Sequence, residues 1–280
     1  MNAPDDKRQI VRALERIADA LENRPPTAAA FDSGKCWRWE IVGNAGVLRP
    51  LPPPAEDLSL LRGVEEQIAS LDANMRAFVR GEAANHALLT GPRGTGKSSV
   101  ARGIFARHMK RGLRLIETDG DGLSCLSALL PALSARREKF AVYCDDLSVN
   151  SGGRFFQRLK SVLEGGIAAA DNWCVVATSN RRRLLPERLD DNLAQFNDEI
   201  HGRETGEEKM ALSDRFGLWV PFFDLSAEEY ETIVVHWLKT LGVAVNTQRR
   251  QQAVRWAEER GAMNGRIARQ FAVACANKSA

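Results

Sequence analysis

Apolar residues recur at helical spacing near the start of the chain. Four of them follow one another at steps of four, three and four residues, which places them on one face of a helix ending before Pro25. They are Ile10, Leu14, Ile17 and Leu21. The stripe lacks sustained heptads, so it favours a helix packed on its own domain over a dimerising coiled coil. We predict this helix over residues 1–24.

The next stretch changes character. Residues 25–57 carry prolines in PPTAAAF and LRPLPPPAED, on either side of an aromatic segment, CWRWEIV. This composition is too irregular for long helices. We therefore predict a proline-rich linker that leans on the core.

Short apolar runs then alternate with helical patterns. A helical pattern extends from Leu58 to Gly81, and five runs of strand length follow. These runs are His86–Thr90, Leu113–Thr118, Phe140–Cys144, Trp173–Thr178 and Leu218–Phe222. Strands that alternate with helices predict an α/β fold with a largely parallel sheet covered on both faces. We expect this core to span residues 58–223.

Helix-start signals replace strand signals after the last apolar run. Ser226 and Glu229 form a capping box, and Asn246 and Asn264 are candidate caps of two further helices. A small helical domain is therefore predicted over residues 224–280.

Composition narrows the class of protein. The 280 residues are 44% hydrophobic, and 39 basic against 36 acidic residues give a net charge of only +3, so the overall charge does not indicate a nucleic-acid or membrane binder. The five cysteines are scattered without a CxxC pair, as in a reducing compartment. The N-terminus lacks a signal-peptide pattern, and no apolar run is long enough to span a membrane. We expect a cytoplasmic protein.

A glycine-rich motif carries the clearest chemistry. GPRGTGKS fits the pattern G-x-x-x-x-G-K-[ST] and stands between a predicted strand and a predicted helix. Its backbone N–H groups and the helix N-terminus would surround phosphates, Lys97 would span the β and γ phosphates, and Ser98 would give a hydroxyl to Mg²⁺. The predicted ATP-binding residues are Gly91, Pro92, Arg93, Gly94, Thr95, Gly96, Lys97, Ser98 and Ser99.

Two aspartates end a buried strand in KFAVYCDD. Phosphoryl transfer needs a carboxylate opposite the P-loop, so we assign Asp145 to Mg²⁺. Asp146 stands where a glutamate usually polarises the attacking water, and its shorter side chain leaves the assignment of the base open. The competing interpretation is a pair of strand-end acids that cap a turn.

The order of these motifs resembles the AAA+ superfamily over roughly residues 58–275. WCVVATSNRR resembles the sensor 1 strand, which implies that Asn180 orients water near the γ-phosphate, with Thr178 as a weaker candidate. LSDRFGLWV resembles the segment with the arginine finger, so Arg215 would reach the γ-phosphate of a neighbouring subunit in a homo-oligomer. Asn180 as a turn former and Arg215 in a local salt bridge are the structural alternatives.

Two further segments resemble AAA+ parts. NGRIARQF is similar to a sensor 2 helix, in which Arg266 would reach back to the phosphates, with Arg269 as the alternate and a solvated arginine as the structural interpretation. The stretch from Leu61 to Val64 resembles the border of the adenine site, and the preference for adenine follows only from that resemblance.

A closer resemblance is to an uncharacterised bacterial group, the domain-of-unknown-function family eight hundred and fifteen. It lies in the blocks ANHALLTGPRGTGKSSV, YCDDLS, LKSVLEGG, ATSNRRRL and EEKMALSDRFGLW. The resemblance implies a predicted ATPase, and it leaves the substrate open.

Absences and local charge bear on the task. The region after the second core strand, TDGDGLSCLSALL, has no aromatic residue, which argues against polypeptide threading. The paired aspartates resemble replication initiators and loaders. Basic residues that could meet phosphate or simply be solvated are Arg181, Arg182, Arg183, Arg188, Arg249, Arg250 and Arg255. The polar connection over residues 190–212 is a candidate partner-binding loop.

Three functions fit these features to different degrees. The first is an oligomeric, Mg²⁺-dependent ATPase that remodels or loads a protein or nucleic-acid partner that the sequence does not identify. The alternative is a nucleotide-gated binding module with slow turnover, which the short Asp146 side chain could suggest. A small-molecule kinase ranks last because it leaves Asn180, Arg215 and the helical end domain unexplained.

Overall fold

The computed structural model describes residues 26–43, 45–147, 153–163, 171–180 and 215–279. The predicted N-terminal helix, the arginines of the 181–188 cluster and the polar connection at 190–212 lie outside the described residues. The strands are β1 (Cys36–Val42), β2 (Ala45–Pro50), β3 (Ala87–Thr90), β4 (Arg114–Thr118), β5 (Phe140–Cys144), β6 (Trp173–Ser179) and β7 (Leu218–Pro221). The α-helices are α2 (Glu65–Arg80), α3 (Lys97–Met109), α4 (Gly120–Ser124), α5 (Leu130–Ser134), α6 (Gly153–Leu163), α9 (Ala227–Thr240), α10 (Thr247–Glu258) and α11 (Gly265–Ser279). Three 3-10 turns are η1 (Ala28–Phe31), η2 (Leu58–Leu60) and η3 (Leu126–Ala128).

The strands form one sheet in the order β2-β1-β4-β5-β6-β3-β7. All neighbouring pairs are parallel except β1 with β2. The five predicted apolar runs are the five strands β3 to β7, with ends that differ by one residue or less from the prediction. The predicted α/β sheet is therefore confirmed.

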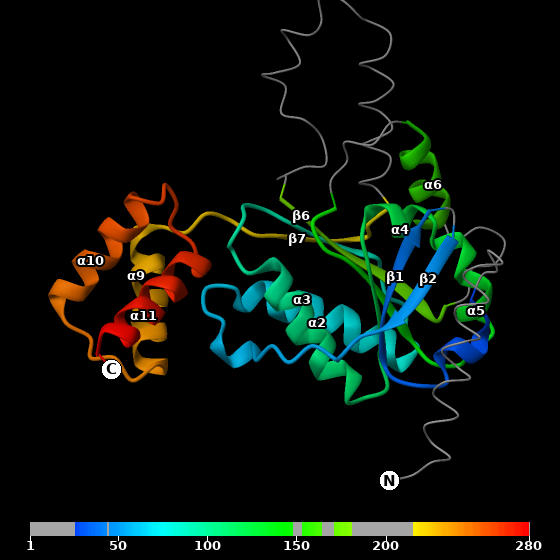
Figure 1. The fold of residues 1–280 in the computed structure, drawn as a ribbon, viewed down its shortest axis with the longest axis horizontal. Coiled ribbons are helices and arrows are strands. Elements are labelled where there is room, and N and C mark those ends of the chain that lie inside the picture. The colour runs from blue at the N-terminus through cyan, green and yellow to red at the C-terminus, as the bar shows by residue number, and fades with distance from the viewer. Residues whose placement is uncertain (1–25, 44, 148–152, 164–170, 181–214, 280) are drawn as a thin grey trace, which may run out of the picture.

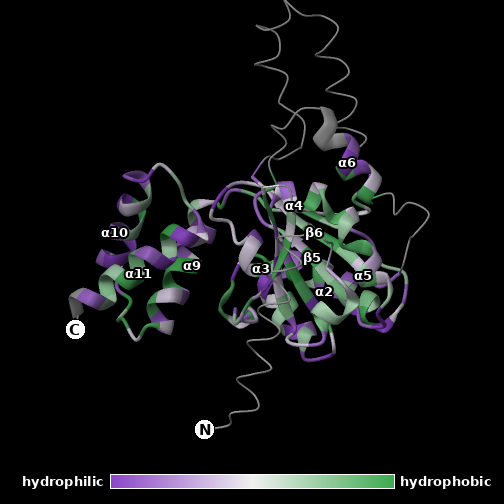
Figure 2. Ribbon diagram, turned by 45° about the vertical axis from the view of Figure 1, so that its right-hand side comes forward, coloured by the Kyte–Doolittle hydropathy of each residue, from purple (hydrophilic) through white to green (hydrophobic). Residues whose placement is uncertain are grey.

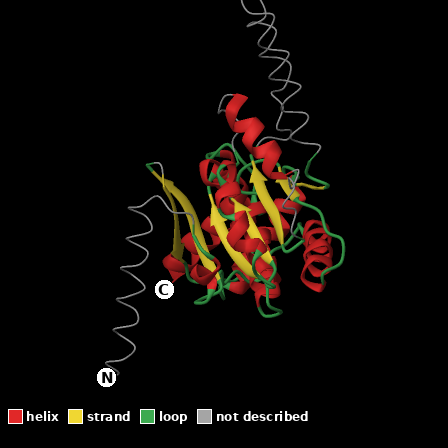
Figure 3. Ribbon diagram, turned by 90° about the vertical axis from the view of Figure 1, so that its right-hand side faces the viewer, coloured by secondary structure: helices red, strands yellow, loops and turns green. Residues whose placement is uncertain are grey.

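Helices cover both faces of this sheet (Figure 3). One buried cluster joins α2 and α3 to the sheet through residues such as Met75, Ile104 and Leu89. A second cluster on the other face joins α4, α5 and α6 through residues such as Leu123 and Leu159. Figure 2 shows the central strands coloured as hydrophobic, as expected of a parallel sheet buried on both sides.

The linker predicted for residues 25–57 is wrong over residues 36–42 and 45–50. This stretch forms the antiparallel hairpin of β1 and β2, and β1 extends the sheet by pairing with β4. Trp37 and Trp39 are each 1% exposed, so burial of large aromatic rings outweighs the turn signal of the nearby prolines. Gly46 is required next to them, because a Cβ there would lie 1.9 Å from the Trp39 ring.

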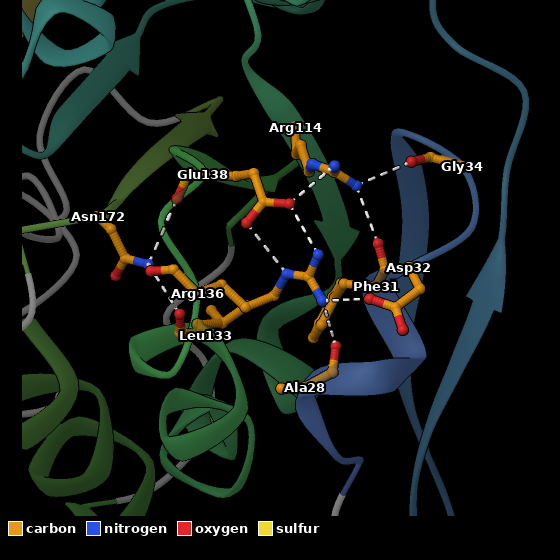
Figure 4. Close-up of polar contacts among 9 residues, drawn as sticks. All are labelled: Ala28, Phe31, Asp32, Gly34, Arg114, Leu133, Arg136, Glu138 and Asn172. Carbon is orange, nitrogen blue, oxygen red and sulfur yellow. Dashed lines mark hydrogen bonds and ion pairs between the residues drawn. The ribbon is translucent and has the colours of Figure 1, made fainter.

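Ion pairs fasten the start of the described chain to the core (Figure 4). Arg136 donates to the Ala28 carbonyl at 2.6 Å and to Asp32 Oδ1 at 2.7 Å, and its Nη2 donates to Glu138 Oε1 at 2.7 Å. Arg114 binds the same Glu138 carboxylate at 2.8 Å. The Arg136 guanidinium lowers the pKa of Glu138 to about 2. The segment before β1 therefore packs as part of the fold.

The last three helices form a separate group beside the sheet (Figure 1). Their apolar side chains make a third cluster, with Tyr230, Val234 and Phe271 at its centre. The predicted capping box is present, because Ser226 Oγ accepts from the Glu229 amide and the Glu229 carboxylate accepts from the Ser226 amide. We refer to α9, α10 and α11 as the lid.

Candidate functional site

The P-loop lies at the carboxyl edge of the sheet, between β3 and α3. Gly91, Gly94 and Gly96 have φ angles of 140°, 82° and 105°, a region that favours glycine. A Cβ on Gly91 would lie 2.2 Å from the Phe222 carbonyl oxygen, so the loop also needs glycine for space. The cap of α3 makes no side-chain hydrogen bond, which leaves the first backbone N–H groups of the helix available to an anion.

Lys97 begins α3 and points its ammonium group back into the loop. Its Nζ donates to the carbonyl oxygens of Gly91 at 2.6 Å and Pro92 at 2.7 Å, and to Asn180 Oδ1 at 3.1 Å. Burial lowers the pKa of Lys97, while the charges of Asp146 and Asp145 oppose this effect. The cation is therefore held beside the loop by neutral oxygens that a phosphate could replace.

Ser98, in the first turn of α3, and Asp145, which follows β5, are hydrogen-bonded to each other. Ser98 Oγ donates to Asp145 Oδ1 at 2.7 Å, and Thr178 Oγ1 on β6 donates to the same oxygen at 2.7 Å. Burial alone would raise the pKa of Asp145, but hydrogen bonds from Thr178 and Ser98 outweigh it and hold the pKa below its usual value.

The oxygen donors of this pair suit a hard cation. A hydroxyl and a carboxylate are groups that Mg²⁺ accepts together with phosphate oxygens and water. Within the described residues, no group of three or more His, Cys, Asp or Glu side chains could hold a metal ion. Ser98 and Asp145 thus fit a metal that shares its coordination with a nucleotide.

Asp146 follows in an unusual backbone conformation. Its φ is 54°, the one positive value for a non-glycine residue in the described chain, and Asp is among the side chains that adopt this left-handed region most readily, as here in a turn. Asn180 Nδ2 donates to Asp146 Oδ1, and the Arg93 guanidinium lies 3.8 Å from Asp146 Oδ2. Asn180 therefore bridges Lys97 and Asp146.

A pocket of about 1000 Å³ joins these groups to the lid. Its lining includes the predicted phosphate and metal residues Gly94, Thr95, Lys97, Ser98, Asp145, Asp146 and Asn180. Leu60, Leu61, Val64, Ile233 and Trp237 are its apolar residues on the side of η2 and α9. The structure thus brings the predicted adenine-border residues and the P-loop into one pocket of a size that suits a nucleotide.

Arg266 and Arg269 also line this pocket from α11. The Arg269 guanidinium lies 5.4 Å from the Trp237 ring, in cation–π range. Trp237 and Ile233 were missed by sequence reasoning, because nothing in the α9 pattern indicates which side faces another domain. Arg102 was missed as well, although its spacing of four residues from Ser98 places it on the same face of α3.

Arg215 lies away from the pocket of its own chain. It precedes β7 by three residues, and β7 runs parallel to β3, so Arg215 is at the amino edge of the sheet while the P-loop is at the carboxyl edge. The side chain is exposed and does not line the pocket. The structure therefore does not bring Arg215 to the other predicted site residues.

Two of the three lid arginines in the basic cluster, Arg249 and Arg250, are engaged locally. Arg250 pairs with Glu231 at 2.5 Å, and Arg249 donates to the Ala244 carbonyl at 2.5 Å. This matches the interpretation of a salt-bridged surface better than that of a phosphate-binding face. Among helices in the described part of the chain, none has the length and apolar character needed to cross a bilayer.

Comparison with known proteins places these features in a family. Residues 32–279 match the family described as "Protein of unknown function (DUF815)". The Holliday junction branch migration complex subunit RuvB of Rubrobacter xylanophilus is 30% identical over 232 residues, which are 78% of this chain and 62% of that protein. The chain thus spans less than two thirds of this relative.

Solved structures agree in fold. The Thermotoga maritima RuvB Holliday junction branch migration motor superposes with a TM-score of 0.52 at 18% identity, over 79% of this chain and 64% of that one. The Aeropyrum pernix ORC1 protein in complex with DNA gives a TM-score of 0.55 at 18% identity, over 81% and 62% of the two chains. At this identity the likeness establishes the AAA+ fold alone.

Proposed function

Since this chain belongs to the DUF815 family and is an AAA+ ATPase homologue, we propose that it binds ATP with Mg²⁺ and hydrolyses it at the interface between two copies. The energy of that reaction would remodel or load a partner. RuvB is named as a subunit of a complex that acts on Holliday junctions, so nucleic acid is the partner class to test first.

The observation that carries the proposal is a hydrogen-bonded set at the carboxyl edge of three adjacent strands. Lys97 follows β3, Asp145 and Asp146 follow β5, and Asn180 follows β6. Lys97 and Asp146 both bind Asn180, and Ser98 binds Asp145. A cation, two carboxylates and an amide in these places are what phosphoryl transfer requires.

Each group has a role in binding. Phosphate oxygens would take the place of the Gly91 and Pro92 carbonyls as partners of Lys97. Ser98 and Asp145 would hold Mg²⁺, which supplies charge neutralisation at the β and γ phosphates when bound. The adenine base would lie against Leu61 and Val64, which line the pocket.

Hydrolysis needs a water placed in line with the γ-phosphate. In this proposal the Asp146 carboxylate accepts the proton of that water as its oxygen bonds to phosphorus and the bond to the bridging oxygen breaks, giving ADP and phosphate. Asn180 orients the water, and Arg266 contacts the phosphates from the lid. Arg215 would act on the next subunit, because it lies at the sheet edge opposite its own P-loop.

One observation favours the alternative of a nucleotide-gated module with slow turnover. Asp146 is held by Asn180 and faces Arg93, so its carboxylate must leave these partners before it can meet a water. A module of this kind would close the lid on ATP and release its partner only rarely.

ATP binding and turnover by Lys97→Ala and Asp146→Asn variants test the proposal and separate it from the alternative. We expect Lys97→Ala to bind ATP at least about a hundredfold more weakly, because it removes a buried charge-assisted partner of the phosphates. Asp146→Asn keeps the amide contacts and should bind ATP normally while turnover falls at least about a hundredfold. Unchanged turnover in Asp146→Asn would remove Asp146 as the base, and wild-type binding by Lys97→Ala would refute the site.

A further inference from the structure

The residues that begin α11 touch the P-loop directly. Asn264 Nδ2 donates to the Arg93 carbonyl at 3.2 Å, and the Arg266 amide donates to the Gly94 carbonyl at 3.2 Å. A Cβ on Gly265 would lie 3.6 Å from the same Gly94 oxygen, which is ordinary contact. Consecutive lid residues therefore rest on consecutive residues of the loop.

Asn264 performs two tasks at this contact. Its Oδ1 accepts from the Ile267 amide at 3.0 Å and so caps α11, while its Nδ2 reaches the loop. One side chain thus joins the start of the helix to the P-loop backbone. Any rotation of α11 that moves Arg266 also strains this link.

Gly94 lies directly against the Asn264 side chain. The motif G-x-x-x-x-G-K-S asks for glycine at Gly91 and Gly96, and Gly94 is additional. A Cβ on Gly94 would lie 2.6 Å from the Asn264 side chain, and φ is 82°. The positive φ by itself favours glycine here, and the missing Cβ also leaves room for the Asn264 side chain.

Peptide geometry links the carbonyl groups that the lid contacts to the N–H groups that would face the phosphates. Each carbonyl of a trans peptide points opposite to the N–H of the following residue, and the described chain contains no cis peptide bonds. Holding the Arg93 and Gly94 carbonyls therefore orients the N–H groups of Gly94 and Thr95 away from the cap. In the proposed site these N–H groups are phosphate donors.

We propose that Asn264 is a positioning residue that couples phosphate binding in the P-loop to the seating of α11, and so to the place of Arg266. The inference rests on the proposed function, since it takes ATP as the ligand. Phosphates that order the Gly94 and Thr95 amides would fix the carbonyls on which the lid rests, and a seated lid would in turn hold those amides for the phosphates.

An Asn264→Ser variant isolates the coupling. Serine is a good neutral cap for α11 and is too short to reach the Arg93 carbonyl. Asn246→Ser is the matched control, because Asn246 caps α10 through the Arg249 amide at 2.8 Å and lies outside the pocket lining. Two quantities are measured on the full chain: the affinity for ATP, and hydrogen exchange at the α11 amides in the presence and absence of ATP. The proteins compared are wild type, Asn264→Ser, Asn246→Ser, Arg266→Ala and the double variant Asn264→Ser/Arg266→Ala.

We expect Asn264→Ser to lower the affinity for ATP about fivefold, which corresponds to the loss of one neutral hydrogen bond. The variant should also show less ATP-dependent protection of the α11 amides from hydrogen exchange. The control should match wild type. In the Arg266→Ala background, Asn264→Ser should lower the affinity for ATP by clearly less than fivefold, because Asn264 acts through the placement of Arg266.

Two outcomes overturn the inference. If wild type binds ATP and Asn264→Ser has the same affinity and the same protection, the lid contact does not couple to the phosphates. If the effects of Asn264→Ser and Arg266→Ala on affinity are fully additive, Asn264 does not act through Arg266. Failure of wild type to bind ATP would instead remove the proposed function itself, and this inference with it.

Discussion

One oxygen of Asp145 accepts hydrogen bonds from two hydroxyl groups. Ser98 is the predicted metal partner, and Thr178 also accepts from the Asp146 amide at 2.8 Å. Thr178 thus connects both aspartates to β6, while Asn180 contacts Lys97 and Asp146. Thr178 and Asn180, at the end of β6, therefore divide between them the contacts with Lys97 and the two aspartates.

A Thr178→Val variant tests this division at constant side-chain shape. We expect ATP turnover to fall about tenfold or more, because Asp145 loses a hydrogen bond to its charged form and the Asp146 amide loses its acceptor. ATP affinity at saturating Mg²⁺ should change far less. Steady-state turnover against ATP and Mg²⁺ concentration provides the measurement.

Thr178→Ser serves as the control, because it keeps the hydroxyl and should retain most of the turnover. Equal turnover in the valine variant and wild type would show that the contacts of Thr178 have no part in the reaction.

Site residues near one another in the sequence could be predicted, and those from distant elements could not. Gly91 to Ser99 form one motif with a known physical purpose, and KFAVYCDD ends a buried strand. Trp237 and Ile233 enter the pocket only through the placement of the lid against η2. That placement depends on tertiary contacts, among them His236 to the Leu60 carbonyl at 3.1 Å.

At the scale of elements, the apolar runs predicted β3 to β7 because a parallel strand buried on both faces has a continuous apolar sequence. The capping residues Ser226, Asn246 and Asn264 predicted the starts of the lid helices for a similarly local reason. The β1–β2 hairpin was not predicted, because prolines flank the segment in the sequence and hide the alternation that buries Trp37 and Trp39. The helical pattern from Leu58 was also too long, since α2 begins at Glu65.

His86 links β3 to β6, and we predict that it makes the sheet sensitive to acid. Its Nδ1 accepts from the Val175 amide at 3.0 Å, and its ring stacks on Trp173 at 5.2 Å. Burial lowers the pKa of His86 to about 4 from 6.5. As the pH falls from 6.5 to 4, His86 becomes protonated in the unfolded chain but stays neutral in the folded chain, so the folded state loses stability over this window. The loss is at most about 3 kcal/mol, because the ring is partly exposed.

The measurement is the free energy of unfolding in urea at pH 7 and pH 4.5 for wild type and His86→Gln. Glutamine can accept from the Val175 amide and does not titrate. We expect the variant to lose less stability than wild type between the two pH values. Identical losses would mean that His86 does not contribute to acid sensitivity.

At the scale of the whole molecule, the site is incomplete within one chain if Arg215 is its arginine finger. The P-loop and the lid close one pocket, while Arg215 lies at the opposite edge of the sheet. A second copy that presents its amino edge to the pocket would supply the missing cation. Turnover per chain should therefore rise with protein concentration.

The most direct test of ATP hydrolysis between subunits mixes two inactive variants. Arg215→Ala has an intact P-loop, and Lys97→Ala has an intact Arg215, so an interface between them contains every proposed group. We predict that each variant alone hydrolyses ATP at a few per cent of the wild-type rate or less, and that an equimolar mixture recovers roughly a quarter of it, as random pairing implies. A mixture no more active than its parts, or an Arg215→Ala variant with wild-type turnover, would contradict the account.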